Sequence, residues 1–175
     1  MRRAWPLAVV AALAGCGGGT QAHQPPKLQV ARASHEYPSP SPRAETVSAG
    51  LPTAVQAVRS FASAYINWTA GTVASDMRAL AGRSVGEARS ALELAAAQTA
   101  SDYELQRGGI ANSGTVEAVA PLPRATREYV VVTRESTSAT NTTAYDGLRP
   151  AWHVALATVS RVGRVWAVSG WQPQS

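Results

Sequence analysis

Apolar residues recur at the helical period of about 3.6 residues in the middle of the chain, and this pattern predicts three helices. The first is expected over residues 53–70. The second is shorter and is expected over 74–81, and the third over 84–100. Ser84 and Glu87 have the spacing of a capping box, in which two side chains satisfy the first free N–H groups of a helix, so the third helix is expected to begin there.

The period changes to two after Gly114, as it does when successive side chains point to opposite faces of a strand. Four strands are expected, over residues 115–122, 127–138, 150–162 and 164–171. The preceding stretch, RGGIANSG at 107–114, is rich in glycine and predicts a loop. Helices followed by a meander of strands predict an α+β fold, in which N-terminal helices pack on one face of a four-stranded antiparallel sheet.

The N-terminus, MRRAWPLAVVAALAGC, has the three parts of a secretory signal. Arg2 and Arg3 supply positive charge, an apolar run follows over 7–13, and small residues precede the cysteine. A membrane-spanning helix needs about 20 apolar residues, so this run is too short to remain in the bilayer as one. The sequence therefore predicts export from the cytoplasm, with a signal peptide over residues 1–15.

Leu13, Ala14, Gly15 and Cys16 stand where this signal would be cleaved, and together they resemble a bacterial lipobox. The resemblance implies that a diacylglyceryl group is transferred to the Cys16 thiol and that the chain is cleaved before Cys16. The new N-terminus can then carry a further acyl chain. A covalent lipid of this kind would anchor the protein to the outer face of the cell membrane, in an extracytoplasmic position. An ordinary signal peptide with a chance cysteine is the alternative.

Residues 16–52 show neither the helical period nor the alternation of a strand. The stretch contains YPSPSP, which is typical of extended polyproline-like chain, and a run of glycines, which is typical of flexible coil. We therefore expect a disordered tether between the lipid and a folded domain over 53–175. His23 and His35 lie in this tether, where nothing fixes the geometry that a metal ion would need.

Charge and cysteine content narrow the possible partners. The chain has 16 basic and 11 acidic residues, and removal of Arg2 and Arg3 with the signal leaves 14 basic residues against 11 acidic ones, a net charge of +3. The arginines are scattered, without a run of three or a basic helical face, which argues against a nucleic-acid-binding surface. Cys16 is the only cysteine, so neither an intramolecular disulfide nor a cysteine zinc site is expected.

Aromatic residues mark both ends of the expected domain. The first helix carries the pattern F..AY..W, formed by Phe61, Tyr65 and Trp68, and the last strand carries G.VW.V..W.P, which includes Trp166 and Trp171. With this order of elements the chain resembles the NTF2-like (cystatin-like, cone-shaped) superfamily, and the resemblance implies a sheet that curves around the helices. Within the superfamily it is similar to extracytoplasmic modules of actinobacterial type, namely conjugation proteins of the TcpC or VirB8-like kind and Mce-associated proteins.

Enzymes of this superfamily, such as ketosteroid isomerases and dehydratases, hold a histidine or an aspartate as acid or base inside the cone. The resemblance therefore makes Tyr65, Asp76, Asp102 and His153 the candidates for an interior pocket. Acid–base catalysis needs two such groups within hydrogen-bond reach of one substrate atom, and no spacing here forces that arrangement. Asp76 is better interpreted as a residue near a helix start, and His153 as a residue on the face or rim of the sheet. No catalytic residue is predicted.

Three tryptophans, Trp152, Trp166 and Trp171, fall near the C-terminal hairpin, where they would either belong to the core or form a binding platform. Without a catalytic constellation, a metal site or a cofactor motif, we expect a non-enzymatic, lipid-anchored accessory protein. Its domain would dock protein partners in an envelope assembly such as a conjugation or secretion apparatus. The alternative is an NTF2-like enzyme of the isomerase or dehydratase type, or a protein that binds a small apolar molecule in the cone.

Overall fold

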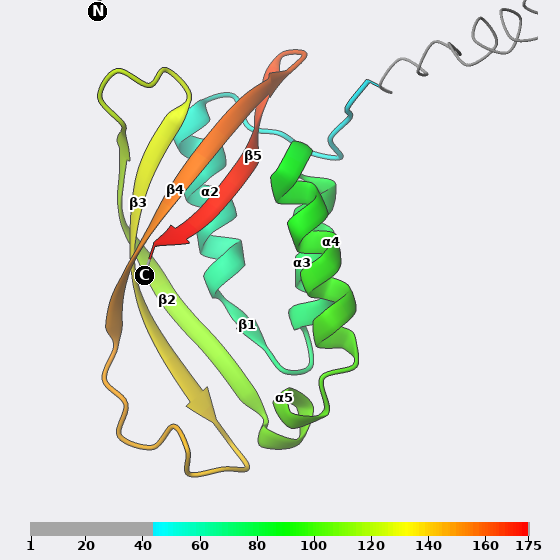
Figure 1. Cartoon of the computed structure of the whole chain (residues 1–175), viewed down its shortest axis with the longest axis vertical. Coiled ribbons are helices and arrows are strands. Elements are labelled where there is room, and N and C mark those ends of the chain that lie inside the picture. The colour runs from blue at the N-terminus through cyan, green and yellow to red at the C-terminus, as the bar shows by residue number, and fades with distance from the viewer. Residues whose placement is uncertain (1–43, 175) are drawn as a thin grey trace, which may run out of the picture. The chain divides into compact units, whose positions relative to one another are not determined.

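The computed structural model describes residues 44–174, which form a helical layer packed against a curled antiparallel sheet (Figure 1). The helices are α2 (Ala54–Ile66), α3 (Val73–Gly82), α4 (Gly86–Ala100) and α5 (Tyr103–Gly108). The strands are β1 (Trp68–Thr69), β2 (Ile110–Pro121), β3 (Glu128–Ala139), β4 (Ala151–Val162) and β5 (Val165–Gln174). They are hydrogen-bonded in the order β1-β2-β3-β4-β5, and every neighbouring pair is antiparallel. The predicted α+β class is therefore confirmed.

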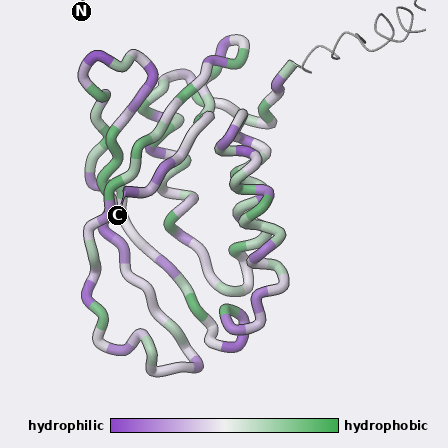
Figure 2. Tube along the Cα trace, viewed as in Figure 1, coloured by the Kyte–Doolittle hydropathy of each residue, from purple (hydrophilic) through white to green (hydrophobic). Residues whose placement is uncertain are grey.

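The core lies between the helices and the inner face of the sheet. Alternation along each strand sends one set of side chains inward, and the amphipathic helices close over them. The side chains buried in this core include those of Val58, Phe61, Ala62, Met77, Leu80, Leu92, Val131, Ala157, Val159 and Val168. Figure 2 shows apolar residues along α4 and along the strands. Within residues 44–174, no helix is both long enough and apolar enough to cross a membrane.

The first helix ends earlier than predicted, at Ile66 rather than at residue 70. Asn67 leaves the helix because its side-chain amide pairs with the backbone of Gly114. Nδ2 donates to the Gly114 carbonyl oxygen at 3.1 Å, and the Gly114 N–H donates to Oδ1 at 3.0 Å. The next two residues, Trp68 and Thr69, pair with β2 and form the short strand β1. The sheet therefore has five strands and not the four predicted.

The start of α4 also differs from the prediction. Ser84 is buried and donates its hydroxyl proton to a backbone carbonyl of α3 at 2.8 Å, so it does not form a capping box with Glu87. The N-cap is Val85, and the free N–H of Gly86 donates to Oε1 of Glu45 at 2.8 Å. A carboxylate from another part of the chain thus satisfies a helix N-terminus that the local sequence was expected to cap.

An entry segment, residues 44–51, packs along the domain. Ser48 donates from both its backbone N–H and its hydroxyl to the last carbonyl of α3, each at 2.9 Å. Leu51 exchanges two backbone hydrogen bonds with Trp166, at 3.1 and 2.8 Å. These residues belong to the same compact unit as the helices and the sheet. Residues 44–51 are therefore part of the folded unit and not of the predicted tether over 16–52. The rest of that predicted tether up to residue 43, like the predicted signal peptide, lies outside the described residues.

A fourth helix, α5, occupies part of the region between the predicted helices and strands. The Asp102 carboxylate accepts from the backbone N–H of Leu105 at 3.0 Å and so caps this helix. Gly109 takes a left-handed conformation, with φ at 60°, which ends the helix and costs a glycine little. β2 begins directly afterwards at Ile110, so the predicted loop over 107–114 is mostly strand.

Candidate functional site

A pocket of about 360 Å³ opens between helices α3 and α4 and the inner face of the sheet. Pockets for small ligands typically have volumes of about 300–1,000 Å³, so its size suits a small molecule. Its walls come from helices and strands together and are mainly apolar. The residues that line it are Tyr65, Trp68, Val73, Met77, Ala95, Thr99, Asn112 and Glu135.

Asn112 and Glu135 lie among the polar residues of the pocket and are held by a network of hydrogen bonds. Asn112 is buried and donates from Nδ2 to the Ile66 carbonyl oxygen at 2.7 Å and to Glu135 Oε2 at 2.8 Å. Its Oδ1 accepts from Thr137 Oγ1 at 3.2 Å. Glu135 Oε1 accepts from Thr133 Oγ1 at 2.5 Å. Both oxygens of the carboxylate are therefore fixed in position by neutral donors.

The strand register explains how Glu135 reaches this position. Thr133, Glu135 and Thr137 alternate along β3, so they share its inner face with the buried Val131. Gly114 lies directly opposite Glu135 on β2. A Cβ atom at Gly114 would lie 3.0 Å from Glu135 Cγ and 2.6 Å from a backbone oxygen of β3. The glycine therefore leaves the room that the glutamate side chain occupies.

Tyr65 stands beside the carboxylate near the end of α2. Its ring packs against Phe61, with centroids 6.0 Å apart, and against Trp171, at 5.4 Å. Burial raises the pKa of the Tyr65 hydroxyl above its ordinary value of 10.0, and the negative charge of Glu135 raises this pKa further. The Trp171 indole N–H lies near enough to oppose this rise, but it falls short of hydrogen-bond geometry and is a buried donor without a partner among residues 44–174. Tyr65 therefore keeps its proton at neutral pH, and its hydroxyl can donate a hydrogen bond to a ligand.

Of the four residues predicted to line an interior pocket, the structure places only Tyr65 there. Asp76 lies in the first turn of α3, in keeping with its interpretation as a residue near a helix start. Asp102 is exposed and caps α5. His153 is exposed on β4, opposite Thr133, in keeping with its interpretation as a residue on the face of the sheet.

Asn112 and Glu135, the hydrogen-bonded polar pair of the pocket, were missed by sequence reasoning. Glu135 has a signal in the sequence, because it stands between two threonines that alternate with it along a strand. The same alternation places the group on the face that carries Val131, which is the inner face. Asn112 has no such signal, since it falls in the stretch that was predicted as a loop.

The three tryptophans do not form one cluster. Trp171 faces inward and packs against the aromatic side chains of α2. Trp166 is partly buried and packs against the edge of the core. Trp152 is 62% exposed, and its ring centroid lies 5.8 Å from the guanidinium carbon of Arg134. Trp152 is thus the one of the three whose ring is open to a partner.

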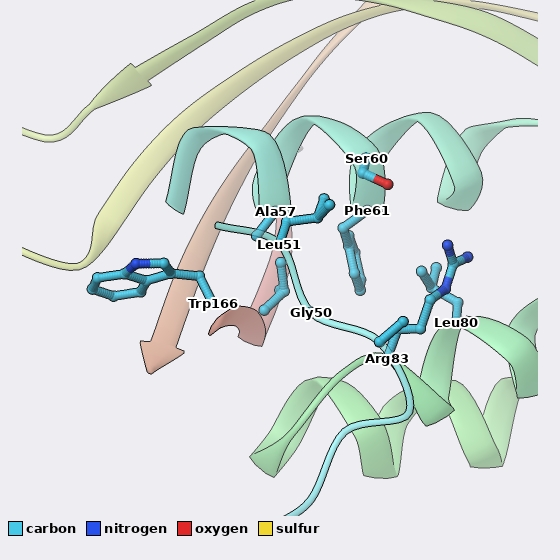
Figure 3. Close-up of a pocket in the computed structure, with 10 residues that line it drawn as sticks. Gly50, Leu51, Ala57, Ser60, Phe61, Leu80, Arg83 and Trp166 are labelled. Carbon is cyan, nitrogen blue, oxygen red and sulfur yellow. The ribbon is translucent and has the colours of Figure 1, made fainter. Parts of the chain in front are cut away.

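A second, smaller pocket lies where the entry segment crosses the domain (Figure 3). It measures about 90 Å³ and is bordered by Gly50 and Leu51 of that segment, by Ala57 and Phe61 of α2, and by Arg83 beyond the end of α3. Its volume is well below that of typical ligand pockets. We interpret it as a small packing gap between the entry segment and the domain, and not as a ligand site.

Residues 44–174 contain no group of three or more histidine, cysteine, aspartate or glutamate side chains placed to hold a metal ion. The pocket beside Tyr65 and Glu135 has apolar walls together with one carboxylate, one phenol, one side-chain amide and one threonine hydroxyl. Comparison with protein-family models, with curated proteins and with solved structures found no match to this chain.

Proposed function

We propose that this domain binds a small, mainly apolar molecule in the pocket beside Tyr65 and Glu135. The observation that carries the proposal is a pocket of about 360 Å³ whose walls are apolar and whose polar groups are few and fixed. In small-molecule sites, apolar surface supplies affinity and a small number of oriented polar groups supplies selectivity. Trp68, Val73 and Met77 provide apolar wall here, while the Tyr65 hydroxyl is a donor and the Glu135 carboxylate an acceptor.

Binding rather than catalysis is the function we infer for this pocket. General acid–base catalysis needs groups that take and return a proton at the reacting atom. Both oxygens of Glu135 already accept hydrogen bonds, and the raised pKa of Tyr65 makes its proton hard to remove. The order of helices and strands around such a pocket also supports an NTF2-like assignment, which forms part of the proposal.

Filling the pocket tests this function. Ala95 lines the pocket from α4, and Ala97 is exposed on the same helix. The probe is N-phenylnaphthylamine, a neutral apolar dye that fluoresces on leaving water, and we expect the full chain to bind it saturably. Ala95→Leu is expected to weaken dye binding at least about tenfold, because the larger side chain takes volume that the dye needs. Ala97→Leu is the control and is expected to bind the dye like the wild type. Equal binding by Ala95→Leu and the wild type, or no saturable binding, would contradict the proposal.

We also propose that a lipid on Cys16 holds the domain at the outer face of the cell membrane. The lipobox resemblance supports this anchor, and the chain between Cys16 and the entry segment would serve as the tether. Cys16→Ser removes the thiol that accepts the diacylglyceryl group. We expect this variant to lose labelling by a radioactive fatty acid and to leave the membrane fraction. Labelling that persists in Cys16→Ser would contradict this anchor, because the lipid would then be attached to another residue.

Trp152 favours a second function, the docking of protein partners. Its side chain is 62% exposed, and Val154, which is 40% exposed, lies two residues further along the same face of β4. Tryptophan is enriched among the residues that dominate the binding energy of protein interfaces. A tethered domain with such a surface would act as an accessory protein in an envelope assembly such as a conjugation or secretion apparatus.

A further inference from the structure

We propose that the ligand of this pocket carries a positive charge, in the form of an organic ammonium group on an apolar body. The inference rests on the proposed function, because it names the chemical class of the molecule that the same pocket would bind. Three features support it: the charge of Glu135, the direction in which the neighbouring basic side chains point, and the aromatic part of the wall.

Glu135 is a partly buried carboxylate without a cationic partner among the described residues. Its two hydrogen-bond donors, Thr133 and Asn112, are both neutral. Within residues 44–174, no arginine or histidine nitrogen lies within 4.0 Å of its oxygens. Partial removal of a carboxylate from water is unfavourable unless an opposite charge compensates it. An ammonium group would supply that charge, and where the group carries N–H bonds each carboxylate oxygen keeps a lone pair with which to accept from them.

The basic side chains nearest to Glu135 along the sheet do not compensate its charge. Arg134 precedes it on β3 and so points to the opposite face, where its guanidinium carbon lies 5.8 Å from the ring centroid of Trp152. His153 is close in register, because it lies opposite Thr133 on β4, but its side chain is exposed. The negative charge of Glu135 is therefore left to face the pocket.

The aromatic part of the wall suits the same ligand. Tyr65 and Trp68 line the pocket together with Glu135. Aromatic rings attract cations electrostatically, and aromatic side chains are the usual means by which proteins recognise quaternary ammonium groups. The apolar body of such an ion would contact Val73 and Met77. An anionic ligand would instead be repelled by Glu135 and would meet no positive group among the lining residues.

Two probes of nearly the same shape separate charge from apolar contact. Benzyltrimethylammonium and neopentylbenzene differ in their quaternary centre, which is a positively charged nitrogen in the first and a neutral carbon in the second. Displacement of N-phenylnaphthylamine from the full chain measures the affinity of each. We expect the wild type to bind the cation at least about tenfold more tightly than its neutral counterpart. Glu135→Gln, which keeps the size of the side chain but removes its charge, is expected to bring the two affinities together.

Glu117→Gln is the matched control, because Glu117 is an exposed carboxylate on β2 and its loss changes the net charge by the same amount. It is expected to leave the preference for the cation intact, and retained dye binding by Glu135→Gln confirms that this variant keeps its pocket. Equal affinities of the two probes for the wild type, or a preference that survives in Glu135→Gln, would overturn the charge assignment. The proposed function would still stand in that case if dye binding responds to Ala95→Leu. Failure of the dye and of both probes to bind would overturn both.

Discussion

Phe61→Ala is expected to lower the free energy of unfolding by about 3–5 kcal/mol, the usual range for removal of a buried phenylalanine side chain. Phe61 is 5% exposed and lies where α2 meets the sheet. Its ring centroid is 5.0 Å from that of Trp171 on β5 and 6.0 Å from that of Tyr65. The same side chain borders the small pocket under the entry segment. Alanine would leave a cavity that these neighbours can fill only by moving from their present positions.

Urea unfolding followed by circular dichroism measures this loss. Val55→Ala is the control, because it also removes an apolar side chain from α2, but Val55 is 41% exposed. We expect Val55→Ala to change the free energy of unfolding by no more than about 0.5 kcal/mol. A loss in Phe61→Ala no larger than that in Val55→Ala would contradict the position of Phe61 in the core.

The spacing of apolar residues correctly predicted the elements in which the burial of each side chain alternates as its position in the sequence does. The strands expected over 127–138 and 150–162 correspond closely to β3 (Glu128–Ala139) and β4 (Ala151–Val162). In both strands one face is buried against the helices, so the alternation in the sequence directly reflects the alternation of environment. The second helix was also placed well, at 74–81 against Val73–Gly82 for α3.

Local patterns failed where a distant residue supplies the deciding hydrogen bond. Asn67 ends α2 by pairing with Gly114, which is 47 residues away in the chain. Glu45 caps α4 by accepting from Gly86, 41 residues away. The apolar stripe of the first helix continued to Trp68, and nothing in that stripe distinguishes a further helical turn from the two-residue strand that follows Asn67. Such boundaries depend on tertiary pairing, which the local sequence does not encode.

The candidate site was predictable only in part for a related reason. Tyr65 was proposed from the family resemblance, and it does line the pocket. Glu135 becomes part of the site because of what lies across the strand pair: Gly114 leaves it room, and Asn112 donates to it. A shift of one residue in the pairing of β2 with β3 would turn these groups to the other face. The register therefore decides the chemistry of the pocket, and the register was not readable from the sequence.

Asn112→Ala is expected to lower the free energy of unfolding by roughly 2–4 kcal/mol. The side-chain amide of Asn112 on β2 connects this strand to α2 and β3, and its removal would leave buried polar groups without partners. It donates to the Ile66 carbonyl at the end of α2 and to Glu135 on β3. It also accepts from Thr137 on β3. Alanine would leave the carbonyl and one carboxylate oxygen without their donor, and the charged acceptor makes that loss larger than for a neutral pair.

Ser113→Ala separates this effect from a general disturbance of β2, because Ser113 is the next residue on the strand and is exposed. In urea unfolding, we expect Ser113→Ala to remain within about 0.5 kcal/mol of the wild type. An Asn112→Ala variant as stable as Ser113→Ala would show that the network does not hold the helix to the sheet.

Because Asn112 also orients Glu135, its removal should reduce the preference for a cationic probe over the neutral one. Phe61→Ala, which disturbs the apolar packing behind Tyr65 but leaves the carboxylate network in place, should instead weaken the binding of both probes to a similar extent.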